Sequence, residues 1–286
     1  MGGENRQSLL GKRLVTGLRQ PNGWRIGSLL VGMIVAIGLL PLVAATLDLE
    51  RRLFFAVHGI CAQSHNLQVG GVQFPLCARD SGIYLGLMVT LGVIACRGRW
   101  RAGRLPPLPV SLTLLGLIVI MGVDGLNSTV AELGWGAVYP PRNDLRLITG
   151  LGFGVAMAVG LLLVANQTLL APDLIDTTQA PIGSWADMGW VVGALALVVL
   201  AIASDQALLA WPLVLISVVG VTGVMTFAIG LPVSAFAGLS GRVRHPRQLL
   251  LPGIAGFLVT LLLLAVLARW KVELEVQGAL PPPLVP

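Results

Sequence analysis

The stretch LITGLGFGVAMAVGLLLVANQTLL, residues Leu147–Leu170, is mostly apolar and contains no charged side chain. A helix needs about 20 mostly apolar residues to cross a lipid bilayer. This stretch is long enough, and its glycines favour close packing against another membrane helix. It therefore predicts a membrane-spanning helix, and the same pattern recurs along most of the chain.

The composition is that of a multi-pass membrane protein. Of 286 residues, 55% are hydrophobic and only 11% are charged, and the mean hydropathy is +0.85. These values lie outside the range of soluble globular domains. The net charge of +6 comes from short clusters of Lys and Arg between apolar runs. That placement is typical of topology signals and argues against a nucleic-acid partner.

Seven stretches are long and apolar enough, or nearly so, to span a bilayer. The second and fifth are the shortest. A further segment, Leu53–Ile60, is too short to span, and we expect it to be re-entrant, interfacial or an extension of a neighbouring helix. The predicted fold is therefore an all-α polytopic bundle of about seven spans. These are Ile26–Leu47, Ser81–Cys96, Pro109–Leu126, Leu147–Leu170, Met188–Ala203, Leu208–Leu231 and Leu249–Ala268.

Basic residues predict the orientation. With seven spans, 12 of the 19 Lys and Arg fall on the side of the N-terminus, so that side is expected to be cytoplasmic in the inner (plasma) membrane. The chain then divides into a basic tail (1–25), a membrane domain that carries the motifs (26–170), an apolar scaffold (171–270) and a Pro-rich tail (271–286) outside.

The candidate functional stretch is VHGICAQSHNLQVGGVQFPLCARDSGIYLG, residues Val57–Gly86, between the first two spans, because it holds two of the three cysteines and two of the three histidines. On a helix, His58, Cys61 and His65 would share one face, and so would Cys77 and Asp80. Brought together, Cys61, His65, Cys77 and Asp80 would offer a tetrahedral zinc site on the extracytoplasmic face.

Two other interpretations of these cysteines stay open. Facing an oxidising compartment, Cys61 and Cys77 would form a disulfide that closes a 17-residue loop. Alternatively, they are unlinked thiols buried as small apolar residues.

Charged residues at the helix entrances predict a polar site on the same face. Asp124 lies near the end of an apolar run, where an unpaired carboxylate is costly. We therefore expect it to pair with Arg79 or with Arg146, and Asn143 to cap the helix that carries Arg146. The predicted polar site, for a ligand or for structure, comprises Arg79, Asp80, Tyr84, Asp124, Asn143 and Arg146.

Two small-residue pairs predict a helix contact. Gly82 with Gly86 and Gly150 with Gly154 each form a G-x-x-x-G pattern near the start of the second and fourth spans. Such patterns allow close backbone approach in membranes, so these two spans are expected to pack together.

The motifs resemble a family of predicted microbial membrane proteins of unknown function. Members have a Cys-x-Gln or Cys-His stretch, then Pro-x-Cys-Ala-Arg-x-x-Gly-x-Tyr, then Asp-Gly and Asn-x-x-Arg-x-x-x-Gly in later spans. Many relatives have Cys where this chain has Asp80, which weakens a metal or dithiol site carried over from them. The resemblance covers roughly residues 55–160 and implies where the site lies, without naming an activity. The matching residues are Cys61-x-Gln63, His65, Pro75-Leu76-Cys77-Ala78-Arg79, Gly82-x-Tyr84, Asp124-Gly125 and Asn143-x-x-Arg146-x-x-x-Gly150.

Two functional hypotheses follow. The first is a membrane protein whose outer-face site binds a metal, with zinc as the candidate cofactor, or a small polar ligand. The second is a non-catalytic accessory subunit of a larger respiratory or photosynthetic membrane complex, whose partners are other membrane subunits. A lipid-modifying enzyme is a third class, but no catalytic residue is assigned, and the absence of familiar catalytic motifs favours a protein that is not an enzyme.

Overall fold

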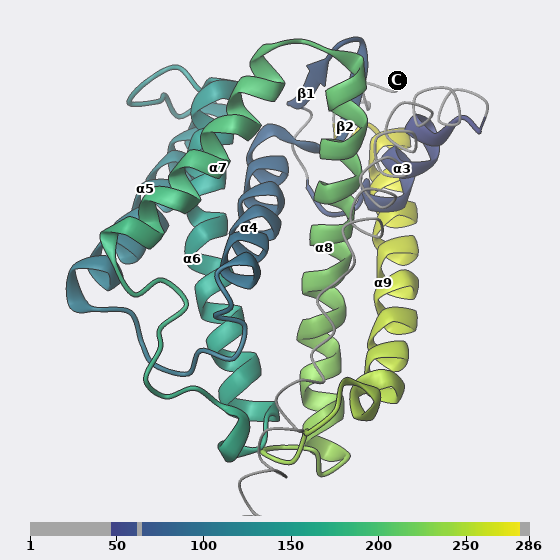
Figure 1. Cartoon of the computed structure of the whole chain (residues 1–286). Helices are drawn as coiled ribbons and strands as arrows, with labels where there is room; N and C mark the ends of the chain where they lie inside the picture. Colours follow the sequence, from purple (N-terminus) through teal and green to yellow (C-terminus); the bar gives the residue numbers. More distant parts are fainter. Residues whose placement is uncertain (1–46, 62–64, 281–286) are drawn as a thin grey trace, which may run out of the picture.

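The computed structural model describes residues 47–61 and 65–280, which fold into a bundle of long helices (Figure 1). Among these residues, six helices are long and apolar enough to cross a membrane. They confirm the second to seventh predicted spans. The first, Ile26–Leu47, and the basic tail lie outside the described residues except for Leu47. The six helices are α4 (Ala78–Cys96), α5 (Leu108–Glu132), α6 (Asn143–Leu169), α7 (Trp185–Ala203), α8 (Ala207–Phe236) and α9 (Leu250–Val276).

The helices extend past their apolar runs because the polar residues at their ends find partners. At the start of α7, the Ser184 hydroxyl accepts a hydrogen bond from the Asp187 backbone N–H (3.2 Å). This N-cap satisfies a free donor of the first turn, so the helix begins three residues before the predicted Met188.

Helix α4 lies in the middle of the bundle and packs most closely on α6. A Cβ atom at Gly82 or Gly86 would collide with backbone oxygens of α6, and one at Gly150 or Gly154 would collide with backbone oxygens of α4. The four glycines therefore bring the two backbones into direct contact, as the two G-x-x-x-G patterns predicted.

A β-hairpin stands at one end of the bundle, formed by β1 (Asn66–Val69) and β2 (Val72–Cys77). Its two-residue turn, Gly70–Gly71, has positive φ at both positions, which suits the twist of a tight hairpin. Every residue of β2 is buried, and Phe74 packs with Leu85 of α4 and Trp211 of α8. The hairpin was not predicted, although Gly-Gly between two valines is a known hairpin signal.

The segment Leu53–Ile60 contributes to a short helix, α3 (Leu49–Val57). With nine residues it is too short to cross a bilayer, and it packs against β2 and the end of α9. It lies at the same end of the bundle as the hairpin (Figure 1).

The helices alternate in direction, so the bundle has two ends. Helices α4, α6 and α8 start at the end that carries β1 and β2, here called the hairpin end, and α5, α7 and α9 return to it. The opposite end, here called the arginine end, is formed by the connections 97–107, 170–184 and 237–249, which include the short turns η1 (Pro172–Leu174) and η2 (Pro246–Leu249). Along the sides, large apolar residues of α5 and α9 are exposed, as expected for surfaces that face lipid.

Candidate functional site

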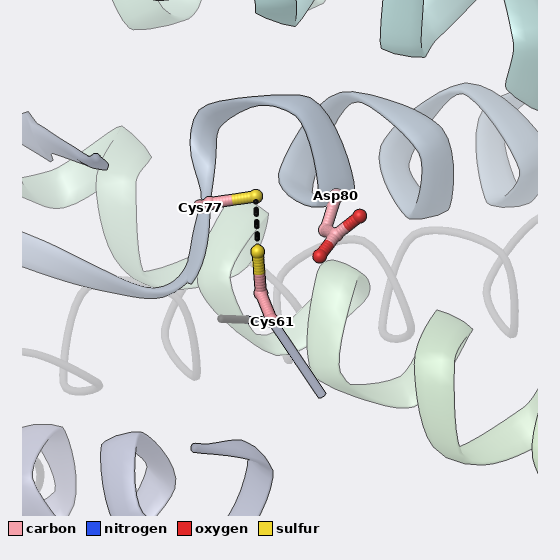
Figure 2. A group of neighbouring side chains, drawn as sticks. All are labelled: Cys61, Cys77 and Asp80. Atoms are coloured by element: carbon pink, nitrogen blue, oxygen red, sulfur yellow. Dashed lines mark hydrogen bonds between the residues drawn. The ribbon is translucent and has the colours of Figure 1, made fainter. Parts of the chain in front are cut away.

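Two cysteines and one aspartate meet at the hairpin end (Figure 2). Cys61 follows α3, Cys77 is the last residue of β2, and Asp80 lies in the first turn of α4. The two sulfur atoms are 3.1 Å apart, and the three side chains place their ligand atoms within 4.8 Å of one another. Since β2 runs directly into α4, one continuous piece of backbone fixes both Cys77 and Asp80.

Cys77 is buried, and Cys61 is partly buried. The hydrogen bond with the Cys61 thiol, and then burial, raise the pKa of the Cys77 thiol. Lys271, near the end of α9, donates from Nζ to the Cys61 carbonyl oxygen (2.7 Å) and lies 3.7 Å from Glu275. Glu275 in turn contacts Nε2 of His58 at 2.9 Å. The last turns of α9 therefore hold the chain just before and at Cys61.

Arg79 and Asp80 are neighbours in sequence but serve different groups, because consecutive helical residues point about 100° apart. Arg79 turns to α5, where its Nη2 donates to Asp124 Oδ2 (2.8 Å) and to the Ser128 hydroxyl (2.8 Å). This confirms the predicted pairing of Arg79 with Asp124. The Asp124 side chain is only 3% exposed, so the pair is a buried one.

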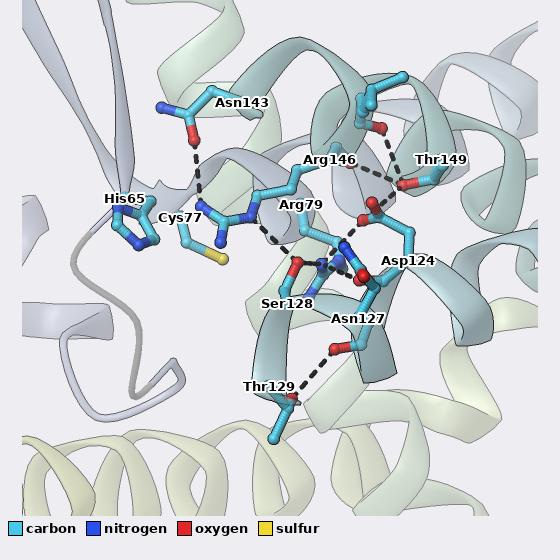
Figure 3. A network of polar contacts seen from close by, with 12 residues as sticks. His65, Cys77, Arg79, Asp124, Asn127, Ser128, Thr129, Asn143, Arg146 and Thr149 are labelled. Atoms are coloured by element: carbon cyan, nitrogen blue, oxygen red, sulfur yellow. Dashed lines mark hydrogen bonds and ion pairs between the residues drawn. The ribbon is translucent and has the colours of Figure 1, made fainter. Parts of the chain in front are cut away.

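The Asp124 carboxylate has further donors. The Tyr139 hydroxyl donates to Oδ1 (2.9 Å), and the Thr149 hydroxyl of α6 lies 3.3 Å from Oδ2. Asn127, one turn after Asp124, accepts from the Val138 backbone N–H (2.8 Å) and so holds the connection between α5 and α6. These bonds tie α4, α5, α6 and that connection together, and Figure 3 shows the contacts of Asp124 with Arg79 of α4 and Thr149 of α6.

Arg146 forms a second, adjacent group. Its buried guanidinium lies 3.5 Å from Glu132 Oε1, 3.4 Å from the Ser128 hydroxyl and 3.3 Å from Asn143 Oδ1. Arg146 therefore pairs with Glu132 and not with Asp124, which was the other predicted pairing. The prediction that Asn143 caps this helix is wrong, because Asn143 is the first residue of α6 and Arg142 precedes it at the N-cap position. The Asn143 side chain instead accepts a hydrogen bond from Arg146.

His65 lies with this second group and not with the thiols. Its Nε2 is 3.6 Å from Glu132 Oε1. Helix α3 ends at Val57, so the helical spacing that would place Cys61 and His65 on one face does not apply. Burial, followed by the positive charge of Arg146, lowers the pKa of His65. A cavity of about 690 Å³ opens here, lined by His65, Ala131, Glu132, Pro141, Arg142, Asn143, Asp144 and Arg146.

Tyr84, the remaining predicted site residue, lies one turn after Asp80 and packs with Val57, Leu76 and Val221. Sequence reasoning missed Glu132, Tyr139, Lys271 and Glu275. Lys271 and Glu275 carry a readable signal, because they form an i,i+4 pair directly after an apolar run. Glu132 and Tyr139 carry no such signal, because their contacts with Arg146 and Asp124 depend on how the connection between α5 and α6 folds back.

Fold and site together define a multi-pass helical membrane protein with a polar site at one end of the bundle. Residues 61–160 match the family described as Predicted membrane protein (DUF2085), which supports the resemblance found in the motifs. The matched segment runs from Cys61 through α6 as far as Gly160, and so contains both polar groups. Searches of curated proteins and of solved structures gave no match.

Proposed function

We propose that this membrane protein binds a thiophilic divalent metal ion, zinc in the first instance, at Cys61, Cys77 and Asp80. The observation that carries the proposal is that one carboxylate and two sulfurs lie within 4.8 Å of one another. Cys and Asp are ordinary zinc ligands, and a set of three protein ligands leaves a fourth position for water or a small polar ligand.

The geometry needs only a small adjustment to hold an ion. With Zn–S bonds of about 2.3 Å, the sulfurs of a tetrahedral site lie about 3.8 Å apart. The two sulfurs, now 3.1 Å apart, would therefore separate by roughly 0.7 Å, which rotation of the Cys61 side chain supplies. Two thiolates and a carboxylate outweigh the charge of the ion, and the ammonium of Lys271, hydrogen-bonded to the Cys61 carbonyl, offsets the excess.

The proposal includes the extracytoplasmic face of the inner (plasma) membrane as the location of the site. Its support is the distribution of charge among the described residues. The connections of the arginine end have seven arginines and two aspartates, and Asp187 in the first turn of α7 brings the net formal charge there to +4. The other described residues include seven basic and nine acidic ones, a net of −2. Because cytoplasmic segments are enriched in Lys and Arg, the arginine end is the better cytoplasmic candidate.

The test is metal binding by the purified, reduced full chain in detergent. We expect one Co²⁺ per chain, with the visible absorption bands that thiolate ligands give. Cys61→Ser and Cys77→Ser should abolish the bands, and Asp80→Cys should strengthen them, because a third thiolate binds soft metals better. Cys96→Ser, an exposed cysteine at the other end, is the matched control and should change nothing. No bound metal in the reduced protein would refute the proposal.

A second candidate is a structural disulfide between Cys61 and Cys77, favoured by the 3.1 Å contact of their sulfurs. In an oxidising compartment, loss of two protons and two electrons to the local oxidant would join them. The crosslink would stabilise the fold by about 3 kcal/mol through the loop that it closes. Chain isolated without reductant would then contain no metal and only one thiol, Cys96, open to labelling.

The accessory-subunit hypothesis belongs to a different class and rests on the long exposed apolar faces of α5 and α9. Membrane lipid would cover these apolar faces as well as a partner subunit would, so their exposure alone does not distinguish the two cases. Purification in mild detergent separates the two cases, because a subunit would elute with a fixed set of partner chains. A monodisperse single chain that retains metal supports the site instead.

A further inference from the structure

We propose that the arginine end binds the headgroups of anionic phospholipids. The surface, here called the arginine surface, consists of Arg101, Arg104, Arg242, Arg247 and the indole of Trp100. It lies at the opposite end of the bundle from the cysteines and is independent of the metal proposal.

The acidic side chains at this end already have partners. Asp187 accepts from both Arg97 and Arg99, and Asp173 pairs with Arg244 at 2.7 Å. The third aspartate, Asp176, accepts hydrogen bonds from the hydroxyl and backbone N–H of Thr178. All three aspartates at this end therefore have partners, and none of those partners is an arginine of the arginine surface. In the part of the chain that the structure describes, the four arginines of the arginine surface are exposed and have no ion-pair partner.

The connections that carry these arginines are held in place by hydrogen bonds. The buried amide of Asn166 donates to the carbonyls of Trp100 (3.0 Å) and Ala102 (2.9 Å). The Asp176 N–H donates to the Arg101 carbonyl (2.8 Å), and the Val243 N–H donates to the Leu169 carbonyl (2.9 Å). Because backbone bonds join the three connections to each other and to α6, the guanidinium groups project from a fixed platform and lose less entropy on binding.

The side chains around the arginines match the chemistry of a phospholipid. Large apolar side chains are exposed next to the arginines, both in sequence and at the helix ends. Guanidinium groups bind phosphate through paired hydrogen bonds. The phosphate of a phospholipid can accept hydrogen bonds from the arginines while its acyl chains cover the apolar side chains. A soluble anion would bind the arginines but leave the apolar side chains exposed to water. The exposed apolar residues are Trp100, Leu105, Leu108, Phe236, Leu250 and Leu251.

A concave region contains Trp100 and Arg101 of this surface and also the carboxylates of Asp173 and Asp176, which already have partners. A cavity of about 620 Å³ is lined by Arg99, Trp100 and Arg101 on one side and by residues 173–179 on the other. Trp100 is 52% exposed. Its indole therefore has access to lipid and can report on a lipid bound at this position.

The experiment uses full-length protein in phosphatidylcholine vesicles that contain increasing amounts of brominated phosphatidylglycerol or brominated phosphatidylcholine. Bromine quenches tryptophan fluorescence on contact. The part of the quenching that comes from Trp100 is the difference in quenched fluorescence between wild type and Trp100→Phe. We expect Trp100 to be quenched more strongly by phosphatidylglycerol. One arginine near an anionic surface contributes roughly a fivefold gain in binding at low salt. The binding constant of phosphatidylglycerol relative to that of phosphatidylcholine should therefore fall at least about tenfold in a variant that combines Arg101→Gln, Arg104→Gln, Arg242→Gln and Arg247→Gln.

The control changes two exposed arginines at the other end, Arg51→Gln with Arg52→Gln, and should leave Trp100 quenching unchanged. Should the quadruple variant not fold, the salt dependence of the wild type decides, because about 1 M salt screens charges beyond about 3 Å. Equal quenching by the two lipids in wild type, or a preference that survives the quadruple change or high salt, would overturn the proposal.

Discussion

Replacing Arg79 with Met removes the only guanidinium that contacts Asp124 among the described residues. In the variant, the Asp124 carboxylate stays buried with only the Tyr139 and Thr149 hydroxyls as donors. Breaking a buried ion pair from one side costs about 3–5 kcal/mol, whereas a neutral hydrogen bond between membrane helices averages about 0.6 kcal/mol. Since the two side chains are 12% and 3% exposed, we expect a loss of about 3 kcal/mol or more in the free energy of unfolding.

Titration with SDS in mixed micelles, followed by tryptophan fluorescence, measures this loss. Adding Asp124→Leu to Arg79→Met removes the stranded charge, and the double variant should recover to within about 1 kcal/mol of wild type. Arg269→Met is the control, because Arg269 and Glu273 form an exposed pair, and should change stability by less than about 0.5 kcal/mol. A loss below about 1 kcal/mol for Arg79→Met alone, or no recovery in the double variant, would show that the pair does not hold α4 to α5.

Three further changes test the fold and the site. In SDS titration, Gly154→Ala should cost about 1–3 kcal/mol because its Cβ would collide with α4, whereas Gly160→Ala, with open space around it, should cost nothing; equal effects would contradict the close contact. The pKa of His65 is lowered by burial and by Arg146, so the unfolded chain binds more protons below about pH 6.5. Melting temperature should therefore rise with pH up to about 6.5 and level off, and His65→Gln should flatten that rise; an unchanged profile would refute this role. Asn166→Leu leaves the carbonyls of Trp100 and Ala102 without their donor and should lower the free energy of unfolding by about 1–3 kcal/mol. Proteolysis within 97–107 should become faster, and an unchanged digestion rate would count against the fixed platform.

Much of the membrane fold was predictable because hydrocarbon imposes a simple requirement of length and apolarity. The contact of α4 with α6 was predictable from Gly82, Gly86, Gly150 and Gly154, since the absence of side chains is itself the signal. The Arg79 partner of Asp124 was predictable for a similar reason, because a carboxylate in an apolar run must find a cation.

The hairpin and the division of the polar residues were not predicted. A helical spacing rule grouped His65 with Cys61, but α3 ends at Val57 and the chain then turns into strands. The Gly70–Gly71 pair between two valines is the sequence signal from which the hairpin is predictable. The pairing of Arg146 with Glu132 depends on how the connection between α5 and α6 folds back, and spacing along the chain contains no information about that.

The contact between α4 and α6 joins helices that are not consecutive in the chain. The contacts within the bundle therefore form in a fixed order as the chain is synthesised. Helix α5 enters the membrane between them and meets α4 first, so Arg79 and Asp124 can find each other as soon as α5 is inserted. The glycine face of α4 has no partner until the ribosome has added Gly150 and Gly154. In a nascent chain that stops after α5, the α6 backbone does not yet cover Gly82 and Gly86 of α4, and completion of α6 closes this contact.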